Sequence, residues 1–237
     1  MRLAAVQSSY IPWKGYFDVI GHVDAFLFLD DVQYTRRDWR NRNRIKLNGE
    51  LHWLTIPVEA KGRYHQRIDE TRVADRSWAE RHWKTLVQAY RRAPYFDETA
   101  ALLEPLYERH AATELLTEVN TGFTSAICAH LGIDTRLSMS TEHETSDEPS
   151  QRLLDLCLAL GADEYVSGPS AQAYLDVERF TRAGVRVSFA DYSRYGEYEQ
   201  LGGPFEHGVS VVDLMFNTGP RARDHLNSVG AAGHAVR

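Results

Sequence analysis

Short apolar runs that stop at polar residues mark the start of the chain. Residues 3–6 form one such run and end at Gln7, and residues 25–29 form a second that ends at Asp30 and Asp31. Both have the composition of buried strands. A short helix is predicted between them, through residues 16–20. Strand, loop, helix and strand in this order indicate a βαβ unit, and such a crossover implies a parallel sheet.

In the middle of the chain the spacing of apolar residues changes. Residues 40–58 hold Asn48-Gly49 between two partly alternating segments, which predicts a β-hairpin. Two stripes of apolar residues spaced three and four apart follow, as expected for amphipathic helices. They are Trp83, Leu86, Val87 and Tyr90, then Leu116, Val119, Phe123 and Ile127. We therefore expect a helical insertion at about 78–132.

The last third returns to alternating strand and helix patterns. Strands are predicted at 136–140, 164–167 and 185–189, with helices after Pro149 and near 171–183. The predicted fold is α/β, with a mostly parallel, doubly wound sheet of the nucleotide-binding kind that carries the hairpin and the helical insertion. We assign residues 1–219 to a single domain and expect 220–237 to form a loosely ordered tail.

Composition narrows the classes of function. The 237 residues carry a formal net charge of −6, which argues against general coating of nucleic acid but leaves room for one local basic site. Cys128 and Cys157 lie in apolar stretches, where cysteine is typically a small buried hydrophobe. The sequence shows neither a signal peptide nor an apolar run long enough to span a membrane, so we expect a soluble cytoplasmic protein.

Three segments follow predicted strands at the edge where an open parallel sheet binds its ligands. The first, residues 7–16, combines polar groups, a glycine and aromatic rings at the start of a helix, where free backbone N–H groups attract anions. Core packing of the aromatic residues is an equal alternative. The candidates are Gln7 as a catalytic group and Tyr10, Trp13, Gly15 and Tyr16 as binding groups.

The second segment is strongly basic. Six cations fall between Thr35 and Lys46 against a single Asp38, in a chain that is acidic as a whole. Arginine binds phosphate or carboxylate through paired N–H groups, so the segment predicts an anion site, with a solvated basic stretch as the alternative. Strand alternation predicts Asn on one face and Arg on the other. The binding candidates are Gln33, Arg36, Trp39, Asn41, Arg42, Asn43, Arg44 and Lys46.

Two smaller groups complete the candidates. Asp30 and Asp31 are catalytic candidates, as a general base or as ligands of magnesium, and pairing with the neighbouring arginines is the alternative. The ten histidines show no metal-ligand spacing, and no protein-held metal is assigned. The third segment is a strand-end turn whose glycine and hydroxyls suit a phosphate or a substrate oxygen, and its candidates are Ser167, Gly168 and Ser170.

Together these segments resemble the WbqC-like family. Three long matches to family motifs read VQSSYIPWKGYFDVI from Val6, FLDDVQYTRRDWRNRNRIK from Phe28 and SVVDLMFNTG from Ser210. Shorter matches cover 53–58 and 165–168. Where the family pattern has His and Pro on either side of the glutamine, this chain has Val6 and Ser8, so no catalytic histidine is transferred from the resemblance.

The resemblance implies a role in sugar modification and, for some members, glycine transfer. The leading hypothesis is an enzyme that joins an amino acid such as glycine to an amine of a sugar or another small acceptor. The acyl group needs activation, and ATP with Mg²⁺, a thioester on an acyl carrier, and aminoacyl-tRNA all stay open. A nucleotidyl or sugar-nucleotide transferase and a non-catalytic protein that binds an anionic ligand are the alternatives.

Overall fold

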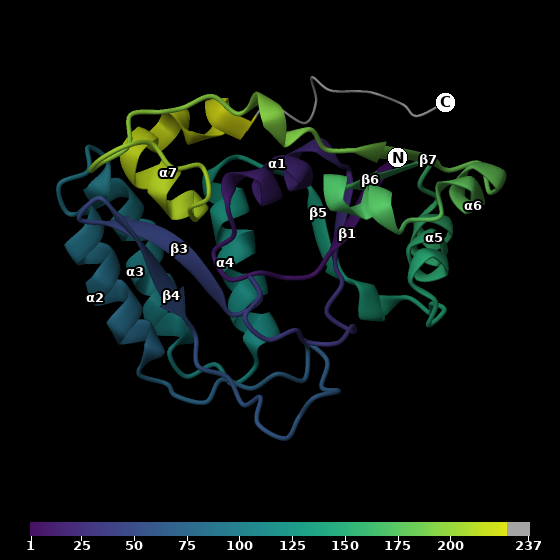
Figure 1. Cartoon of the computed structure of the whole chain (residues 1–237), viewed down its shortest axis with the longest axis horizontal. Helices are drawn as coiled ribbons and strands as arrows, with labels where there is room; N and C mark the ends of the chain where they lie inside the picture. Colours follow the sequence, from purple (N-terminus) through teal and green to yellow (C-terminus); the bar gives the residue numbers. More distant parts are fainter. Residues whose placement is uncertain (227–237) are drawn as a thin grey trace.

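The computed structural model describes residues 1–226. Within that range a five-stranded, fully parallel sheet forms the centre of the fold, in the order β5-β2-β1-β6-β7 (Figure 1). Its strands are β1 (Arg2–Val6), β2 (Ala25–Phe28), β5 (Arg136–Met139), β6 (Glu164–Ser167) and β7 (Arg186–Phe189). The predicted parallel α/β sheet is confirmed, and each predicted strand has its counterpart.

Helices cover both faces of the sheet, because the side chains of each strand alternate between two apolar layers. Leu3 and Ala5 of β1 share one buried cluster with α5 (Pro149–Leu160) and α6 (Val177–Arg182). Ala4 and Phe26 belong to the other cluster, which contains α1 (Lys14–His22). The sheet is therefore doubly wound, as predicted.

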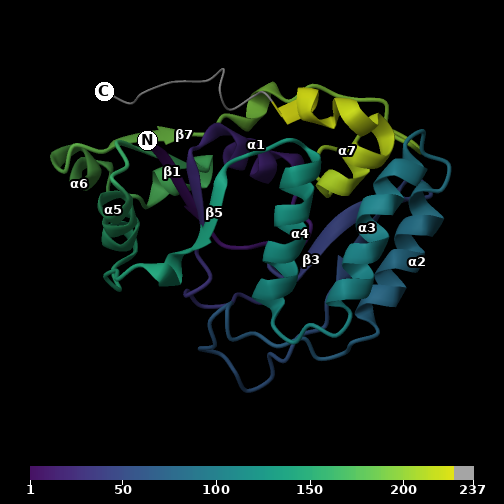
Figure 2. The ribbon, with the colours of Figure 1, turned by 180° about the vertical axis from the view of Figure 1, so that it is seen from behind.

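A separate antiparallel hairpin lies beside a group of helices. Its strands are β3 (Arg42–Leu47) and β4 (Glu50–Thr55), and the turn uses Asn48 at φ 53° and Gly49 at φ 83°, the left-handed region that this residue pair favours. Beside it pack α2 (Trp78–Tyr90) and α7 (Val211–Thr218), α3 (Phe96–His110) packs against both of these helices, and α4 (Leu116–His130) lies between β5 and α3 (Figure 2). Ile45 and Leu54 fill the space beneath the hairpin.

Two stretches differ from the predictions. The helix expected near 171–183 is divided into a 3-10 turn at Pro169–Ala173 and α6, whose start is capped by the side chain of Asp176. Beyond residue 219, a 3-10 helix at Gly219–Leu226 buries Ala222 and Leu226, so packing continues into the expected tail; residues 227–237 lie outside the described residues. Further 3-10 turns cover Ser140–Glu142 and Tyr192–Arg194. No helix in the described part of the chain is long and apolar enough to cross a membrane.

Candidate functional site

The strand order changes direction at β1. From β1 the chain runs to β2 and then β5 on one side, and it returns through α5 to β6 on the other side. The carboxyl ends of β1 and β6 therefore form a topological switch point, the usual ligand position in an open α/β sheet. A cavity of about 510 Å³ opens there, with Gln7 after β1 and Gly168 after β6 in its wall.

The cavity wall draws on all three segments predicted from the sequence. Nine predicted residues line it: Gln7, Trp13, Tyr16, Trp39, Asn43, Arg44, Ser167, Gly168 and Ser170. Further polar and aromatic wall residues, which sequence reasoning did not select, are Ser9, Arg40, Tyr174 and Tyr192. The rule that pointed to strand ends applies to Tyr192 as well, because it follows β7 closely.

Asn43 fastens the hairpin to the loop after β1. Its Nδ2 donates to the carbonyl oxygens of Tyr10 at 3.1 Å and Ile11 at 3.0 Å, and its Oδ1 accepts from the backbone N–H of Arg44 at 2.8 Å. Ile11 has φ 35°, a strained value for a β-branched residue, and Ser210 Oγ also donates to its carbonyl oxygen at 2.6 Å. Alternation along β3 points Asn43 inward and Arg42 and Arg44 to the other face, as predicted. These bonds bring Arg44 to the cavity.

Arg44 is the unpaired cation of the wall. Its Nε is buried without a hydrogen-bond partner, and its guanidinium forms no ion pair with any of residues 1–226. Gly208 leaves room for it, because a Cβ there would fall 2.3 Å from Arg44 Nη2. Arg40 Nε is also buried without a hydrogen-bond partner, but Arg40 donates to the Ser8 carbonyl at 3.2 Å and forms an ion pair with the Asp38 carboxylate at 3.7 Å. A half-buried cation without a partner favours binding of an anion.

Aromatic rings form another part of the wall. Trp13 meets Tyr192 edge to face, with 4.8 Å between ring centroids. Gly15 does not line the cavity; a Cβ there would fall 2.3 Å from the Trp13 ring, so the glycine makes space for the indole. Burial raises the pKa of Tyr16, which keeps its hydroxyl protonated as it donates to the Gln7 carbonyl at 3.1 Å.

Comparison with known proteins agrees with this arrangement of motifs. The model of the WbqC-like protein family matches residues 7–225. The chain belongs to the WbqC-like protein family. An uncharacterized protein of Mycobacterium tuberculosis, Rv1507c, is 49% identical over 227 residues, which cover 95% of this chain and 97% of that protein. No solved structure matches the chain significantly.

Asp30 of this WbqC-like chain, a catalytic candidate from the sequence, has structural partners in the core. It is fully buried and lies outside the cavity wall. Its Oδ1 accepts from the backbone N–H of Ser8 at 2.7 Å, and its Oδ2 accepts from Thr117 Oγ1 at 2.5 Å. Asn120 Nδ2 adds a bond to Ser8 Oγ at 3.0 Å. The buried carboxylate therefore shapes the loop after β1.

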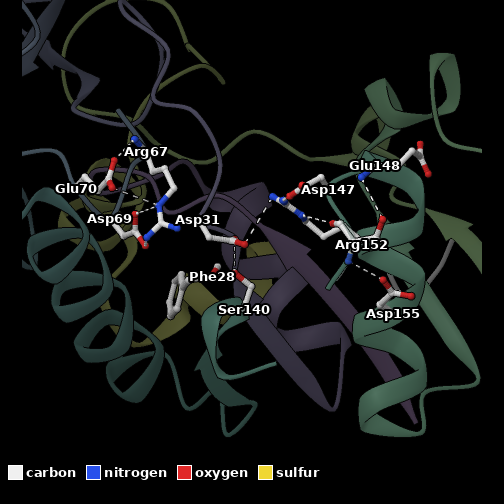
Figure 3. Close-up of polar contacts among 11 residues, drawn as sticks. Phe28, Asp31, Arg67, Asp69, Glu70, Ser140, Asp147, Glu148, Arg152 and Asp155 are labelled. Atoms are coloured by element: carbon white, nitrogen blue, oxygen red, sulfur yellow. Dashed lines mark hydrogen bonds and ion pairs between the residues drawn. The ribbon is translucent and has the colours of Figure 1, made fainter. Parts of the chain in front are cut away.

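Asp31 also lies outside the cavity wall and turns toward α5 (Figure 3). Its Oδ1 accepts from Ser140 Oγ at 2.6 Å, and its Oδ2 lies 3.6 Å from Arg152 Nη1. The pairing with arginine that sequence reasoning allowed does occur, but with Arg152 of α5 and not with the basic segment. Asp31, like Asp30, is therefore held by structural partners away from the cavity.

The other predicted residues outside the wall have structural partners. The Tyr10 hydroxyl bonds to His82 Nδ1 at 2.9 Å in the core. Asn41 Nδ2 and Lys46 Nζ each donate at 2.7 Å to a backbone carbonyl, of Ile56 and Pro204 respectively. Gln33, Arg36 and Arg42 donate to the carbonyl oxygens of Tyr64, Ala60 and Arg37.

The wall residues do not fit a magnesium ion held by the protein. Mg²⁺ usually takes one or two protein carboxylates in addition to substrate phosphates. The described wall has no carboxylate, and no cluster of three or more His, Cys, Asp or Glu suited to a metal occurs within residues 1–226. Val6, at the position where the family pattern has histidine, gives the wall an apolar side chain. The site's chemistry is therefore that of two guanidinium groups, hydroxyls, amides and aromatic rings.

Proposed function

We propose that this WbqC-like protein transfers an aminoacyl group, with glycyl as the leading case, from an activated donor to the amine of a small acceptor such as an amino sugar. One observation carries the proposal: the cavity at the β1–β6 switch point, where Arg44 has no ionic partner in the described chain. Both kinds of activated donor carry phosphate, at the far end of the pantetheine arm in a carrier thioester and on the terminal nucleoside in an RNA ester, and phosphate suits this guanidinium. Such donors are made in the cytoplasm, where we propose that the protein acts.

The atoms and electrons of the proposed reaction balance without a cofactor. The acceptor's amine nitrogen attacks the carbonyl carbon of the donor, the C–N bond forms, and the C–O or C–S bond to the carrier breaks. The departing oxygen or sulfur takes up the proton that the amine loses. Arg44 holds the donor's phosphate, and the hydroxyls of Ser167 and Ser170 and the amide of Gln7 are available to the carbonyl oxygen or the acceptor.

An activated donor is supported better than activation by ATP in the same site. Activation of a free acid would bring Mg²⁺ with the nucleotide, and the described wall lacks the carboxylates that usually hold it. The wall also lacks a histidine or carboxylate to act as a base. We therefore expect the acceptor to react as its free amine, so that the rate rises with pH up to the amine's own pKa, about 8 for an ordinary α-amino group.

The test compares three donors in parallel. Purified protein is incubated with a panel of amino sugars and with glycyl-tRNA, with a small glycyl thioester, or with glycine plus ATP and Mg²⁺, and the products are analysed by mass spectrometry. Glycyl amide formed from a pre-activated donor is the expected result. Amide formed only with ATP would replace the proposal by a ligase. Release of a nucleotide from sugar nucleotides without an amide would favour a sugar-nucleotide transferase.

A further inference from the structure

Two exposed tryptophans and two arginines form a ladder on the outer face of the hairpin. Trp39 and Trp53 are each 41% exposed, with ring centroids 5.4 Å apart and planes inclined by 33°. The Arg42 guanidinium carbon lies 4.3 Å from the Trp53 ring centre, and that of Arg44 lies 5.6 Å from Trp39 and 5.7 Å from Trp53. We call these four residues the Trp–Arg ladder. Large exposed rings in contact with each other commonly mark a binding surface.

The two guanidinium groups of the ladder are only partly satisfied within the described chain. The Nε atoms of Arg42 and Arg44 are both buried without hydrogen-bond partners, and neither guanidinium forms an ion pair with a described residue. Asp38 accepts from Thr35 Oγ1 at 2.8 Å, and the Glu206 carboxylate, which lies near Arg44 beside Gly208, accepts from the backbone N–H of Gly208 at 2.7 Å. A chain with net charge −6 thus keeps a local positive surface.

The ladder is continuous with the cavity and extends beyond it. Trp39 and Arg44 line the cavity, whereas Arg42 and Trp53 do not. Arg42 donates to the carbonyl oxygen of exposed Arg37, and the neighbouring Arg36 donates to that of Ala60, in the loop that β4 leads into (Figure 1). Cations therefore continue from the cavity mouth along the hairpin base to that loop. A ligand that uses the whole track is longer than one that fills the cavity alone.

We propose that the Trp–Arg ladder binds the single-stranded 3′ end of an RNA, which delivers its aminoacyl ester to the cavity. Successive bases stack on aromatic rings whatever their sequence, and arginines alongside neutralise the phosphates. This inference rests on the proposed function and identifies its donor. The acceptor amine attacks the ester carbonyl, the C–O bond to the terminal ribose breaks, and the ribose hydroxyl takes the proton. A protein carrier would not need two flat rings in contact, so RNA is favoured over a carrier.

The experiment measures binding of a 5′-labelled single-stranded RNA that ends in CCA, by fluorescence anisotropy over a range of salt concentrations. Loss of one stacked base in Trp53→Ala weakens binding by about tenfold. Loss of one phosphate contact in Arg42→Ala weakens binding and makes the slope of log K against log salt shallower by about 0.7. Leu51→Ala on β4 and Arg182→Ala on α6 are controls for an exposed apolar residue and an exposed cation, and both should bind as wild type.

Failure of the inference can be told apart from failure of the proposed function. Wild-type protein is also given glycyl-tRNA and the small glycyl thioester, with an amino sugar as acceptor. Turnover of the thioester without RNA binding, or RNA binding that neither Trp53→Ala nor Arg42→Ala weakens, would overturn the inference and leave a carrier protein as the donor. RNA binding that depends on both residues, without amide from any donor, would keep the ladder as an RNA site and remove the transferase.

Discussion

The cavity wall and the buried cluster around Asp213 are both polar, but they use their hydrogen bonds differently. Asp213 is fully buried, and its carboxylate accepts from the hydroxyls of Tyr90 and Tyr198 and from Gln200 Nε2, each at 2.7 Å. At the wall, Arg44 carries a buried Nε without a partner in the described chain. The first arrangement is closed and stabilises the fold, whereas the second is open and leaves a cation for a ligand.

This difference separates structural from functional residues among the family motifs. Asp213 and Arg44 both lie within the residues 7–225 that the WbqC-like family model matches. Only the balance of donors and acceptors distinguishes them. The two regions therefore predict opposite outcomes: substitutions in the closed cluster should change stability, and substitutions at the open wall should change binding.

Asp213→Ala should give the largest effect. It leaves two tyrosine hydroxyls and one amide without their buried acceptor, so we expect the free energy of unfolding to fall by about 4 kcal/mol. Urea denaturation followed by circular dichroism measures this loss. Asp213→Asn keeps an acceptor oxygen of the same shape and should lose clearly less. Equal losses in the two variants would show that the cluster is not held by its acceptor.

The buried hydrogen bonds of His82 predict a dependence of stability on pH. Burial lowers the pKa of His82 to about 4 from its ordinary 6.5, while its ring bonds to the Tyr10 hydroxyl and the Thr55 carbonyl. Between these values the unfolded chain binds the proton more strongly, so stability falls as the pH is lowered from 6.5 to 4, by about 3 kcal/mol at most.

His82→Gln removes this proton uptake and isolates it from the other titrating groups. The difference in unfolding free energy between wild type and His82→Gln, measured by urea denaturation at several pH values, should shrink as the pH falls through this window. A difference that stays constant from pH 7 to pH 4 would contradict the lowered pKa of His82.

At the open wall, Arg44→Ala should weaken binding of the anionic donor with little loss of stability. A charge-assisted hydrogen bond contributes about 2 kcal/mol, which corresponds to roughly thirtyfold in the dissociation constant. Titration with the small glycyl thioester of a phosphate-bearing pantetheine measures it. Arg92→Ala, an exposed cation after α2, is the control and should bind as wild type. A thirtyfold loss in both variants would point to the protein's overall charge.

The sequence was sufficient to predict the sheet, but it did not predict the direction in which individual side chains point. Apolar runs such as residues 3–6 and the Asn48-Gly49 turn carry local signals, and both were placed correctly. The strand-end rule located the switch point, because it follows from connectivity. Asp30 and Arg44 lie in one long motif, yet one bonds to Thr117 on α4 and the other faces the cavity. That difference depends on partners distant in sequence, which no local pattern contains.

Gly15 and Gly21 of α1 give the smallest and most local test of the wall. In an exposed helix, alanine is preferred to glycine by about 1 kcal/mol. At Gly21 an added Cβ would lie 3.7 Å from the Ile133 side chain, an ordinary contact, so Gly21→Ala should gain up to that amount. At Gly15 the same atom would fall 2.3 Å from the Trp13 ring, which cannot stay where it is.

We expect Gly15→Ala to lose about 1 kcal/mol in urea denaturation, because the helix preference offsets part of the cost of the clash. The displaced indole should also change its fluorescence and weaken binding of the thioester, since Trp13 lines the cavity and rests against Tyr192. Opposite signs for two glycine-to-alanine changes in one helix would tie the glycine of the Trp-Lys-Gly-Tyr motif to the shape of the wall. A gain in stability at both positions would mean that the Trp13 ring is free to move, and that the aromatic part of the wall is less rigid than its packing indicates.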